Sequence, residues 1–265
     1  MISDMFLMKV NNDNKIIEAQ NYYELSGEKI NLFEHDSKVI LEDEDLSCEM
    51  HNKTLFSVVK DTAIDIVRGE NKTCCVLDYA SYKDAGGLVE EGVNSQEESL
   101  CYPSNLHSIL KEHQLDFYCK HIAEGMNYGF YSDESIFVNN VTLFRDSEFS
   151  LTTPKSFNVI VTAAPYAKII KRYRPYLAKI INKFLFYRCK RVLEIAKYYK
   201  QDVIVLGPFG CGVFGNDVEI LTRIWKYLLN NDFKNVFKKV IFSVPNFNGA
   251  EDEEKYELFK KKFES

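Results

Sequence analysis

Residues 77–105 read LDYASYKDAGGLVEEGVNSQEESLCYPSN and place a small-residue loop a fixed distance ahead of two adjacent carboxylates. The segment before the loop is bounded like a strand, and the segment after it like a helix. Gly86 and Gly87 allow the backbone to pass close to a ligand, where a side chain would clash. The Gln-Glu-Glu at residues 96–98 then delivers acids to the same neighbourhood. This layout predicts an active site.

Two adjacent acids behind a glycine loop suit the cleavage of a ribosyl bond. An oxocarbenium-like transition state needs a proton for the leaving group and a carboxylate near the developing positive charge. Glu97 and Glu98 can divide these two tasks. The structural alternative is that QEES forms the acidic first turn of a helix, where acids complement the helix dipole. Taken alone, the motif slightly favours that structural role.

The wider segment changes this balance. DYASYKDAGGLVEEGVNSQEESL resembles the signature of the microbial-type poly(ADP-ribose) glycohydrolases, whose glycine triplet, short spacer and QEE lie in a macrodomain-like fold. Later segments resemble the same family in the same order: FYSDESIFVNNVTLFRD (130–146), FNVIVTAAPYA (157–167) and VIVLGPFGCGVFGND (203–217). The chain departs from the family pattern at two places. Asp84 and Ala85 replace an asparagine-proline, and Leu88 replaces the third glycine, but the acids are kept.

The resemblance implies a role for each residue of the motif. Glu98 matches the family's catalytic acid, Glu97 the acid that holds the ribose hydroxyls, and Gln96 a supporting residue. The distal ribose of the ligand then reaches the loop of Gly86 and Gly87. Neither a cofactor nor a metal is implied by the resemblance.

A second glycine-rich motif follows the buried-type run at residues 203–206. GCGVFG at residues 210–215 matches G-x-G-x-x-G and precedes a predicted helix, which Asn216 or Asp217 caps. Glycines let successive amides point at phosphate oxygens, and the helix N-terminus adds partial positive charge. We expect a diphosphate here, with a tight structural turn as the alternative. The expected substrate contacts are Gly210, Cys211, Gly212, Val213, Phe214 and Gly215.

The resemblance makes this loop the one that wraps the diphosphate of ADP-ribose. Phe214 then packs against the ribose or adenine, or else serves as a core or hinge residue. A Rossmann nicotinamide enzyme is the main rival, but its fingerprint opens the first strand-helix unit, whereas only 50 residues follow Gly215. Cys211 is expected to pack rather than to act as a nucleophile, because the matched segments offer it no suitable histidine.

Polar residues near these motifs need separate weighing. Asp78 and Ser81 end the strand before the glycine loop and are candidates for ligand contact, although strand-terminal polar residues need no function. The five histidines form no i, i+4 pair and no HExxH motif. The spacing therefore predicts no metal site.

Composition limits the class of protein. With 265 residues and 46% hydrophobic content, the chain can bury a full core, and it is not of disordered type. Seven cysteines at irregular spacings fit a reducing compartment better than a disulfide framework. No apolar run is long enough for a membrane span. We expect a soluble cytoplasmic protein.

Charge gives a weaker signal. The net charge of −6 argues against a nucleic-acid partner. Basic residues concentrate between residues 168 and 200 but alternate with an apolar stripe, so a solvated helix face is favoured over a polyanion-binding surface. The tail at 250–265 resembles the glutamate-rich export signals of type IV secreted effectors, although an ordinary amphipathic helix is favoured.

The hydrophobic pattern predicts an α/β fold. Residues 15–34 suggest two short strands around a Ser-Gly turn, and residues 53–69 a helix. Residues 167–201 predict a long helical region, broken near Arg174-Pro175. Buried-type strands are expected at 73–80, 159–163, 203–206 and 240–244.

Alternating strands and helices imply a largely parallel mixed sheet covered on both faces. The resemblance makes this a macrodomain-like three-layer α/β/α domain at residues 52–265, with residues 1–51 as a β/α extension packed on the core.

We therefore expect an ADP-ribosyl glycohydrolase that acts through a Glu acid/base. Its substrate partner is an ADP-ribosylated protein, with arginine as one possible acceptor, or the terminal unit of an ADP-ribose polymer. The alternative is a non-catalytic ADP-ribose reader. The protein is expected to be a monomer.

Overall fold

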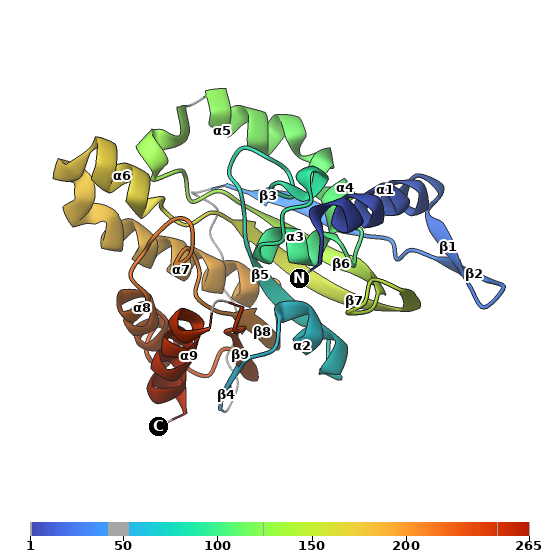
Figure 1. Cartoon of the computed structure of the whole chain (residues 1–265). Coiled ribbons are helices and arrows are strands. Elements are labelled where there is room, and N and C mark those ends of the chain that lie inside the picture. Colours follow the sequence, from blue (N-terminus) through green and yellow to red (C-terminus); the bar gives the residue numbers. More distant parts are fainter. Residues whose placement is uncertain (1, 42–52, 124, 248, 265) are drawn as a thin grey trace.

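A seven-stranded mixed sheet forms the centre of the computed structural model, which describes residues 2–41, 53–123, 125–247 and 249–264 (Figure 1). The strand order is β3-β6-β7-β5-β8-β9-β4. The bounds are β3 (Asp36–Ile40), β4 (Leu55–Val59), β5 (Cys74–Tyr79), β6 (Ser135–Arg145), β7 (Leu151–Thr162), β8 (Val203–Leu206) and β9 (Lys239–Ser243). β3 and β7 pair antiparallel with β6, and the strands from β7 to β4 pair in parallel. The largely parallel mixed sheet expected from the sequence is confirmed.

Helices cover both faces of this sheet (Figure 1). Along β5, Cys74 and Val76 pack with one group of helices, and the alternate residues Cys75 and Leu77 pack with the other. The first group is α1 (Asp4–Gln20), α2 (Ala63–Gly69), α3 (Gln96–Cys101) and α4 (Leu106–Glu112). The second group is α7 (Ile181–Tyr198), α8 (Val218–Asn230) and α9 (Ala250–Phe263). The three-layer α/β/α architecture is therefore confirmed.

Shorter elements connect these layers on the side of the sheet where β5, β7 and β8 end. They are η1 (Val89–Glu91), η2 (Gln114–Cys119), α5 (Lys120–Ala123), η3 (Gly125–Gly129), α6 (Ala167–Tyr173) and η4 (Pro175–Ile180). The predicted break near Arg174-Pro175 is confirmed, because α6 ends at Tyr173 and a separate 3₁₀ turn begins at Pro175. No helix in the described ranges is long and apolar enough to cross a membrane.

The helix predicted over residues 53–69 is wrong in its first half. β4 occupies Leu55–Val59 and pairs in parallel with β9, and α2 begins only after Thr62, whose hydroxyl accepts a hydrogen bond from the amide of Asp65. Apolar residues at a spacing of three or four fit a helix, but here Val58 is buried in a half-covered edge strand. The amide of Val58 donates to Glu264 Oε1 (2.7 Å), so the end of α9 covers part of this edge.

The expectation for residues 15–34 is half right. The hairpin is present as β1 (Tyr22–Leu25) and β2 (Glu28–Asn31) around the Ser-Gly turn, but residues 15–20 belong to α1. Asn21 ends this helix in the left-handed conformation, with φ of 58°. The expected domain boundary between residues 51 and 52 lies outside the described residues.

The N-terminal segment is joined to the core through buried polar contacts. Asn14 on α1 donates to the carbonyl of Tyr102 (2.8 Å) and accepts from Nε of Arg145 (2.7 Å). Arg145 is itself buried and donates to the carbonyl of Phe149 (2.8 Å). A Cβ added at Gly92, just after η1, would overlap the backbone of Asp4. α1 therefore supports the loop that leads to residues 96–98.

We predict that Asn14→Ala destabilises the fold by about 2 kcal/mol, because it leaves Nε of the buried Arg145 and the Tyr102 carbonyl without their hydrogen bonds to this side chain. Urea unfolding would measure this loss. Asn12→Ala, at an exposed position of the same helix, is the matched control and should be near neutral. Equal stability of the two variants would contradict the role given to Asn14.

Candidate active site

The Glu98 carboxylate joins the glycine loop to α3. Glu98 is the third residue of the helix, and its Oε2 accepts from the amide of Ser95 (3.2 Å) and from the Ser95 hydroxyl. Its Oε1 accepts from the amide of Leu88 (2.8 Å). The side chain is only 4% exposed. QEES therefore does form the first turn of a helix, as the structural alternative predicted. The same Glu98 carboxylate also lies against the glycine loop.

Glu97 and Asp78 form an acidic pair beside Glu98. Glu97 Oε2 accepts from the amide of Ser81 (2.6 Å), whereas Oε1 is buried without a hydrogen-bond partner among the described residues. Asp78 is fully buried at the end of β5, and neither of its oxygens has such a partner in that part of the chain. Burial, and then the charge of Asp78, raises the pKa of Glu97 well above its usual range. Burial, and then Glu98, raises the pKa of Asp78 in the same way.

Gln96 is committed to the end of β5. Its Oε1 accepts from the amide of Tyr79 (2.8 Å), and its Nε2 donates to the carbonyl of Leu77 (2.9 Å). The supporting role expected for Gln96 therefore takes a definite form, because the amide fixes α3 against the strand that carries Asp78. These two hydrogen bonds of Gln96 therefore also position Glu97 and Glu98, which follow it on α3.

The glycines of the loop leave room for protein side chains. Gly86 and Gly87 both adopt positive φ (72° and 62°), which favours glycine. A Cβ at Gly87 would overlap Glu98 Oε1, and a Cβ at Gly86 would lie 2.8 Å from His107 Cδ2. Leu88 has φ of −105° and is 41% exposed, so a third glycine is not required by the backbone here. Leucine at this position does not distort the turn.

The second loop presents free backbone amides. Within the described residues, the amides of Gly212, Val213 and Phe214 donate to no other group. Gly210 and Gly215 adopt positive φ (71° and 69°) on either side of them. Consecutive unpartnered amides between two such glycines are the kind of donors that anion-binding turns use. The predicted diphosphate loop thus has the required donors.

Neighbouring residues fix the shape of this loop. Asn216 Nδ2 donates to the carbonyls of Pro165 (2.8 Å) and Gly210 (2.9 Å), which closes the neck of the loop. Asp217, not Asn216, caps α8 by accepting from the amides of Glu219 and Ile220. Because these first helix amides are already satisfied, the loop's own amides, rather than the helix N-terminus, are the donors open to an anion.

The side chains of this loop differ in their surroundings. Cys211 is buried, and burial raises the pKa of its thiol to about 12, which agrees with the packing role predicted for it. Val213 is 69% exposed. Phe214 is partly buried and stacks on Tyr166, with ring centroids 4.5 Å apart and an interplanar angle of 17°. Because the Cys211 side chain is buried, only the backbone of this residue can face a ligand.

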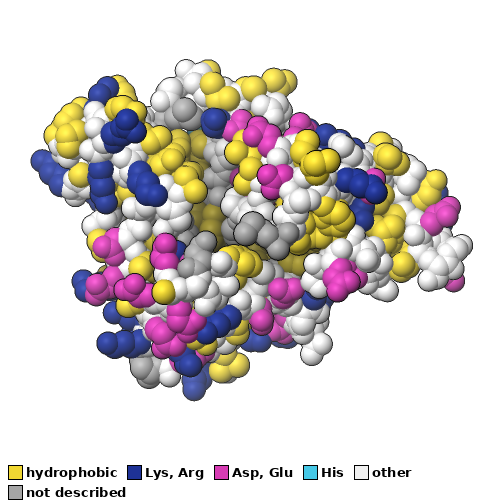
Figure 2. All heavy atoms as spheres, viewed as in Figure 1, with side chains coloured by type: hydrophobic (Ala, Val, Ile, Leu, Met, Phe, Trp, Pro, Cys, Tyr) yellow, Lys and Arg dark blue, Asp and Glu magenta, His cyan; other side chains and the backbone are white. Residues whose placement is uncertain are grey.

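Sheet topology brings the acid cluster and the anion loop together. β5 and β8 are adjacent parallel strands, so the loops that follow them leave the same edge of the sheet. The two loops touch where the Tyr79 and Phe209 rings lie 5.6 Å apart, and a Cβ at Gly207 would overlap the Tyr79 hydroxyl. Figure 2 shows a hollow on this face with hydrophobic side chains at its base.

An aromatic row near the hollow was not predicted from the sequence. Tyr131 stacks on Tyr82 (4.5 Å, 9°) and lies 6.2 Å from Phe214, which in turn stacks on Tyr166. Tyr131 has a positive φ of 62°, which is rare for an aromatic residue. Tyr82 and Tyr166 each follow the carboxyl end of a buried strand, and that position is the signal that could have marked them.

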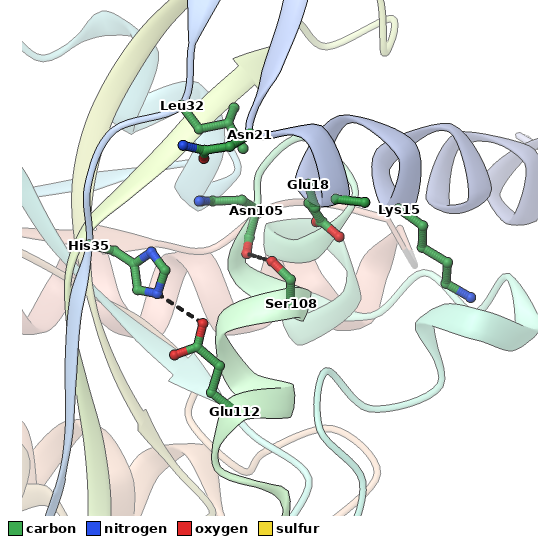
Figure 3. A pocket seen from close by; sticks show the side chains of 9 residues that line it. Lys15, Glu18, Asn21, Leu32, His35, Asn105, Ser108 and Glu112 are labelled. Carbon is green, nitrogen blue, oxygen red and sulfur yellow. Dashed lines mark hydrogen bonds and ion pairs between the residues drawn. The ribbon is translucent and has the colours of Figure 1, made fainter.

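A separate cavity of about 360 Å³ lies between α1 and α4 (Figure 3). It is lined by Lys15, Glu18, Ala19, Asn21, Leu32, His35, Asn105, Ser108 and Glu112. His35 Nε2 lies 3.1 Å from Glu112 Oε1, and burial raises the pKa of Glu18 to about 7. None of the predicted site residues lines this cavity, so we do not assign it to the active site. In the described ranges no group of three or more His, Cys, Asp or Glu side chains is arranged to hold a metal.

Comparisons with known proteins agree with the observed fold. The family described as microbial-type PARG, catalytic domain, matches residues 10–146. The chain is 24% identical to poly(ADP-ribose) glycohydrolase from Thermomonospora curvata, over 98% of this chain and all of that chain, with a TM-score of 0.88. It is 30% identical to poly(ADP-ribose) glycohydrolase from Deinococcus radiodurans in complex with ADP-ribose, over 80% of this chain and 84% of that chain, with a TM-score of 0.73. Comparison with curated proteins gives no match.

We predict that Asp78→Asn makes the protein more stable at pH 7. Because folding raises the pKa of Asp78, the unfolded chain loses this proton at a lower pH than the folded chain, and the stability of the wild type falls as pH rises between the two values. The difference between variant and wild type should disappear below pH about 4, near the usual pKa of aspartate. Urea unfolding at several pH values measures it.

Asp84→Asn is the control for this comparison, because Asp84 belongs to the same loop and its side chain is 40% exposed. Its stability relative to the wild type should change little with pH. An Asp78→Asn variant whose stability relative to the wild type falls as pH rises would show that the carboxyl is charged in the folded protein.

Proposed function

The chain belongs to the microbial-type poly(ADP-ribose) glycohydrolase family, and on that basis we propose that it hydrolyses the glycosidic bond between the distal ribose of ADP-ribose and its acceptor. One observation carries the proposal. A buried acid cluster and three amides without partners among the described residues lie at the carboxyl ends of the adjacent parallel strands β5 and β8. A ligand with a ribose at one end and a diphosphate next to it matches these two sites.

The diphosphate lies over the loop at residues 210–215 in this proposal. The amides of Gly212, Val213 and Phe214 donate to its oxygens, and Gly212 has open space around its Cα. Phe214 and its stacked partner Tyr166 offer an aromatic wall for the adenosine part of the ligand. The net charge of the protein is negative, so this local set of donors supplies the attraction for the phosphates.

Glu98 is the acid/base of the proposed reaction. It gives a proton to the acceptor atom as the bond to the ribose breaks, and it then takes a proton from the water that attacks the ribose carbon. Its burial beside the glycine loop keeps bulk water away from that carbon. Glu97 binds the ribose hydroxyls through the oxygen that has no partner among the described residues.

The neighbouring acids suit this chemistry because they limit negative charge in the cluster. The pKa values of Glu97 and Asp78 are both raised by burial, so three adjacent carboxyl groups need not all be ionised. The acceptor is either a protein side chain that carries one ADP-ribose, arginine for example, or the next unit of a polymer whose terminal unit occupies the site. Leu88, exposed beside Glu98, borders the acceptor side.

We predict that Glu98→Gln lowers kcat by at least ~1000-fold while ADP-ribose still binds, because the amide keeps the shape but cannot transfer a proton. Release of ADP-ribose from modified protein measures turnover, and calorimetry measures binding. Glu91→Gln, at an exposed position of η1, is the control and should keep full activity. A Glu98→Gln variant with more than a few per cent of the wild-type rate would exclude Glu98 as the acid/base.

We also predict that Gly212→Val weakens ADP-ribose binding by at least ~10-fold without loss of stability. A Cβ at Gly212 meets no atom within 4 Å and the φ angle there is not positive, so the fold tolerates the side chain, while the approach of phosphate to the amides is blocked. Gly69→Val is the matched control, because its surroundings are equally open and it lies at the end of α2. Unchanged affinity in folded Gly212→Val would make the loop a structural turn only.

A further inference from the structure

A cationic face adjoins the active site. Residues 167–193 contain nine Lys or Arg and no Asp or Glu, in a chain whose net charge is −6. Within the described residues, six of these cations form no ion pair with an acid. They are Lys168, Lys171, Arg172, Arg174, Lys179 and Lys183. All six are exposed between α6 and the start of α7, with Arg174 at the junction of α6 and η4, and we call this surface the α6 face.

Exposed tyrosines lie among these cations. Tyr128, Tyr173 and Tyr176 are 62%, 58% and 67% exposed. The Arg174 guanidinium lies 5.2 Å from the centre of the Tyr128 ring, and the guanidinium of Arg172 lies 5.2 Å from that of Tyr173. Aromatic rings that alternate with unpaired cations are typical of surfaces that bind a flexible chain of bases and phosphates.

The α6 face is continuous with the anion loop. The Lys168 amide donates to the carbonyl of Phe214 (3.0 Å), and its side chain lies against Gly215. In Figure 2, Lys and Arg side chains gather over α6 on one flank of the hollow, whereas Asp and Glu side chains lie on the opposite flank. An anionic chain that leaves the hollow is therefore attracted toward α6.

We propose that the α6 face binds ADP-ribose units that adjoin the unit in the active site, an inference that rests on the proposed function. Each unit of such a polymer carries two phosphate charges and one adenine. The cations neutralise the phosphates, and the exposed tyrosines stack on the bases. The sequence pattern favoured a solvated helix face, but the missing acid partners and the exposed rings between the cations favour a polyanion site.

The test compares affinity for ADP-ribose with affinity for short ADP-ribose oligomers of defined length. The Glu98→Gln variant serves as the parent protein, so that oligomers are not degraded. Lys171→Ala, Arg172→Ala and Arg174→Ala are combined in it, and Lys168 is left intact because it contacts the anion loop. The matched control combines Lys234→Ala, Lys260→Ala and Lys261→Ala, three exposed cations away from the α6 face, and so removes the same charge.

The parent protein should bind oligomers at least ~10-fold more tightly than ADP-ribose at low salt, and this advantage should shrink as salt rises, because counterions are released on binding. The α6-face variant should lose that advantage and keep its affinity for ADP-ribose within ~2-fold, since the anion loop is untouched. The control variant should keep the advantage.

Three results would overturn the inference. The first is normal binding of ADP-ribose together with an oligomer affinity that is no higher than the ADP-ribose affinity, or that the three substitutions do not change. This result would refute the role of the α6 face and leave the proposed function intact. An oligoadenylate of equal charge that binds as tightly as the ADP-ribose oligomer would identify a general nucleic-acid surface instead. Failure of folded parent protein to bind ADP-ribose at all would refute the proposed function, and the inference with it.

Discussion

Glu98 accepts hydrogen bonds from two segments, the amide of Leu88 in the glycine loop and residue Ser95 at the start of α3. The same loop has a second contact with α3, because the amide of Ser81 donates to Glu97, and its two glycines adopt positive φ. One carboxylate therefore sets the loop, the helix and the position of the proposed acid at the same time. The side chain that is proposed to carry out the chemistry, Glu98, therefore also holds Leu88 and Ser95 in place.

The burial of three carboxyl groups in this cluster costs free energy, which the rest of the fold must offset. Asp78, Glu97 and Glu98 are all buried, and none of them forms an ion pair with a cation in the described part of the chain. Burial raises the pKa values of Asp78 and Glu97, which favours their neutral forms. Stability comes instead from apolar packing on both faces of the sheet, and from buried polar contacts such as Asn14 with Arg145. The apolar core therefore stabilises a fold that also contains these three buried carboxyl groups.

The sequence was informative wherever a local rule acts alone. Buried-type apolar runs predicted β5, β8 and β9, and Arg174-Pro175 predicted the break between α6 and α7. It failed where tertiary pairing decides, as at β4, whose apolar spacing fits a helix until pairing with β9 is known. β6 and β3, which give the sheet its antiparallel end, were also not identified as strands.

The site was predicted unevenly for similar reasons. The glycine and acid motifs located Glu97 and Glu98, because such motifs are local in sequence. Other features depend on contacts across the fold. They are the complete burial of Asp78, the hydrogen bonds of Gln96 to β5, and the stacking of Tyr131 on Tyr82. In the case of Gly87, the pattern indicated the residue type correctly, but the nearest atoms belong to Glu98 rather than to a ligand.

The pairing of β4 with β9 also orders events during biosynthesis. These strands lie at residues 55–59 and 239–243, so the pairing of β4 cannot form until residues 239–243 have left the ribosome. Until then β4 has no parallel partner, and its apolar residues remain available for other contacts. The helix that follows β9 then covers this same strand, where Glu264 accepts from the amide of Val58. The segment that follows β9 therefore covers part of the strand whose pairing partner lies farthest away in the sequence.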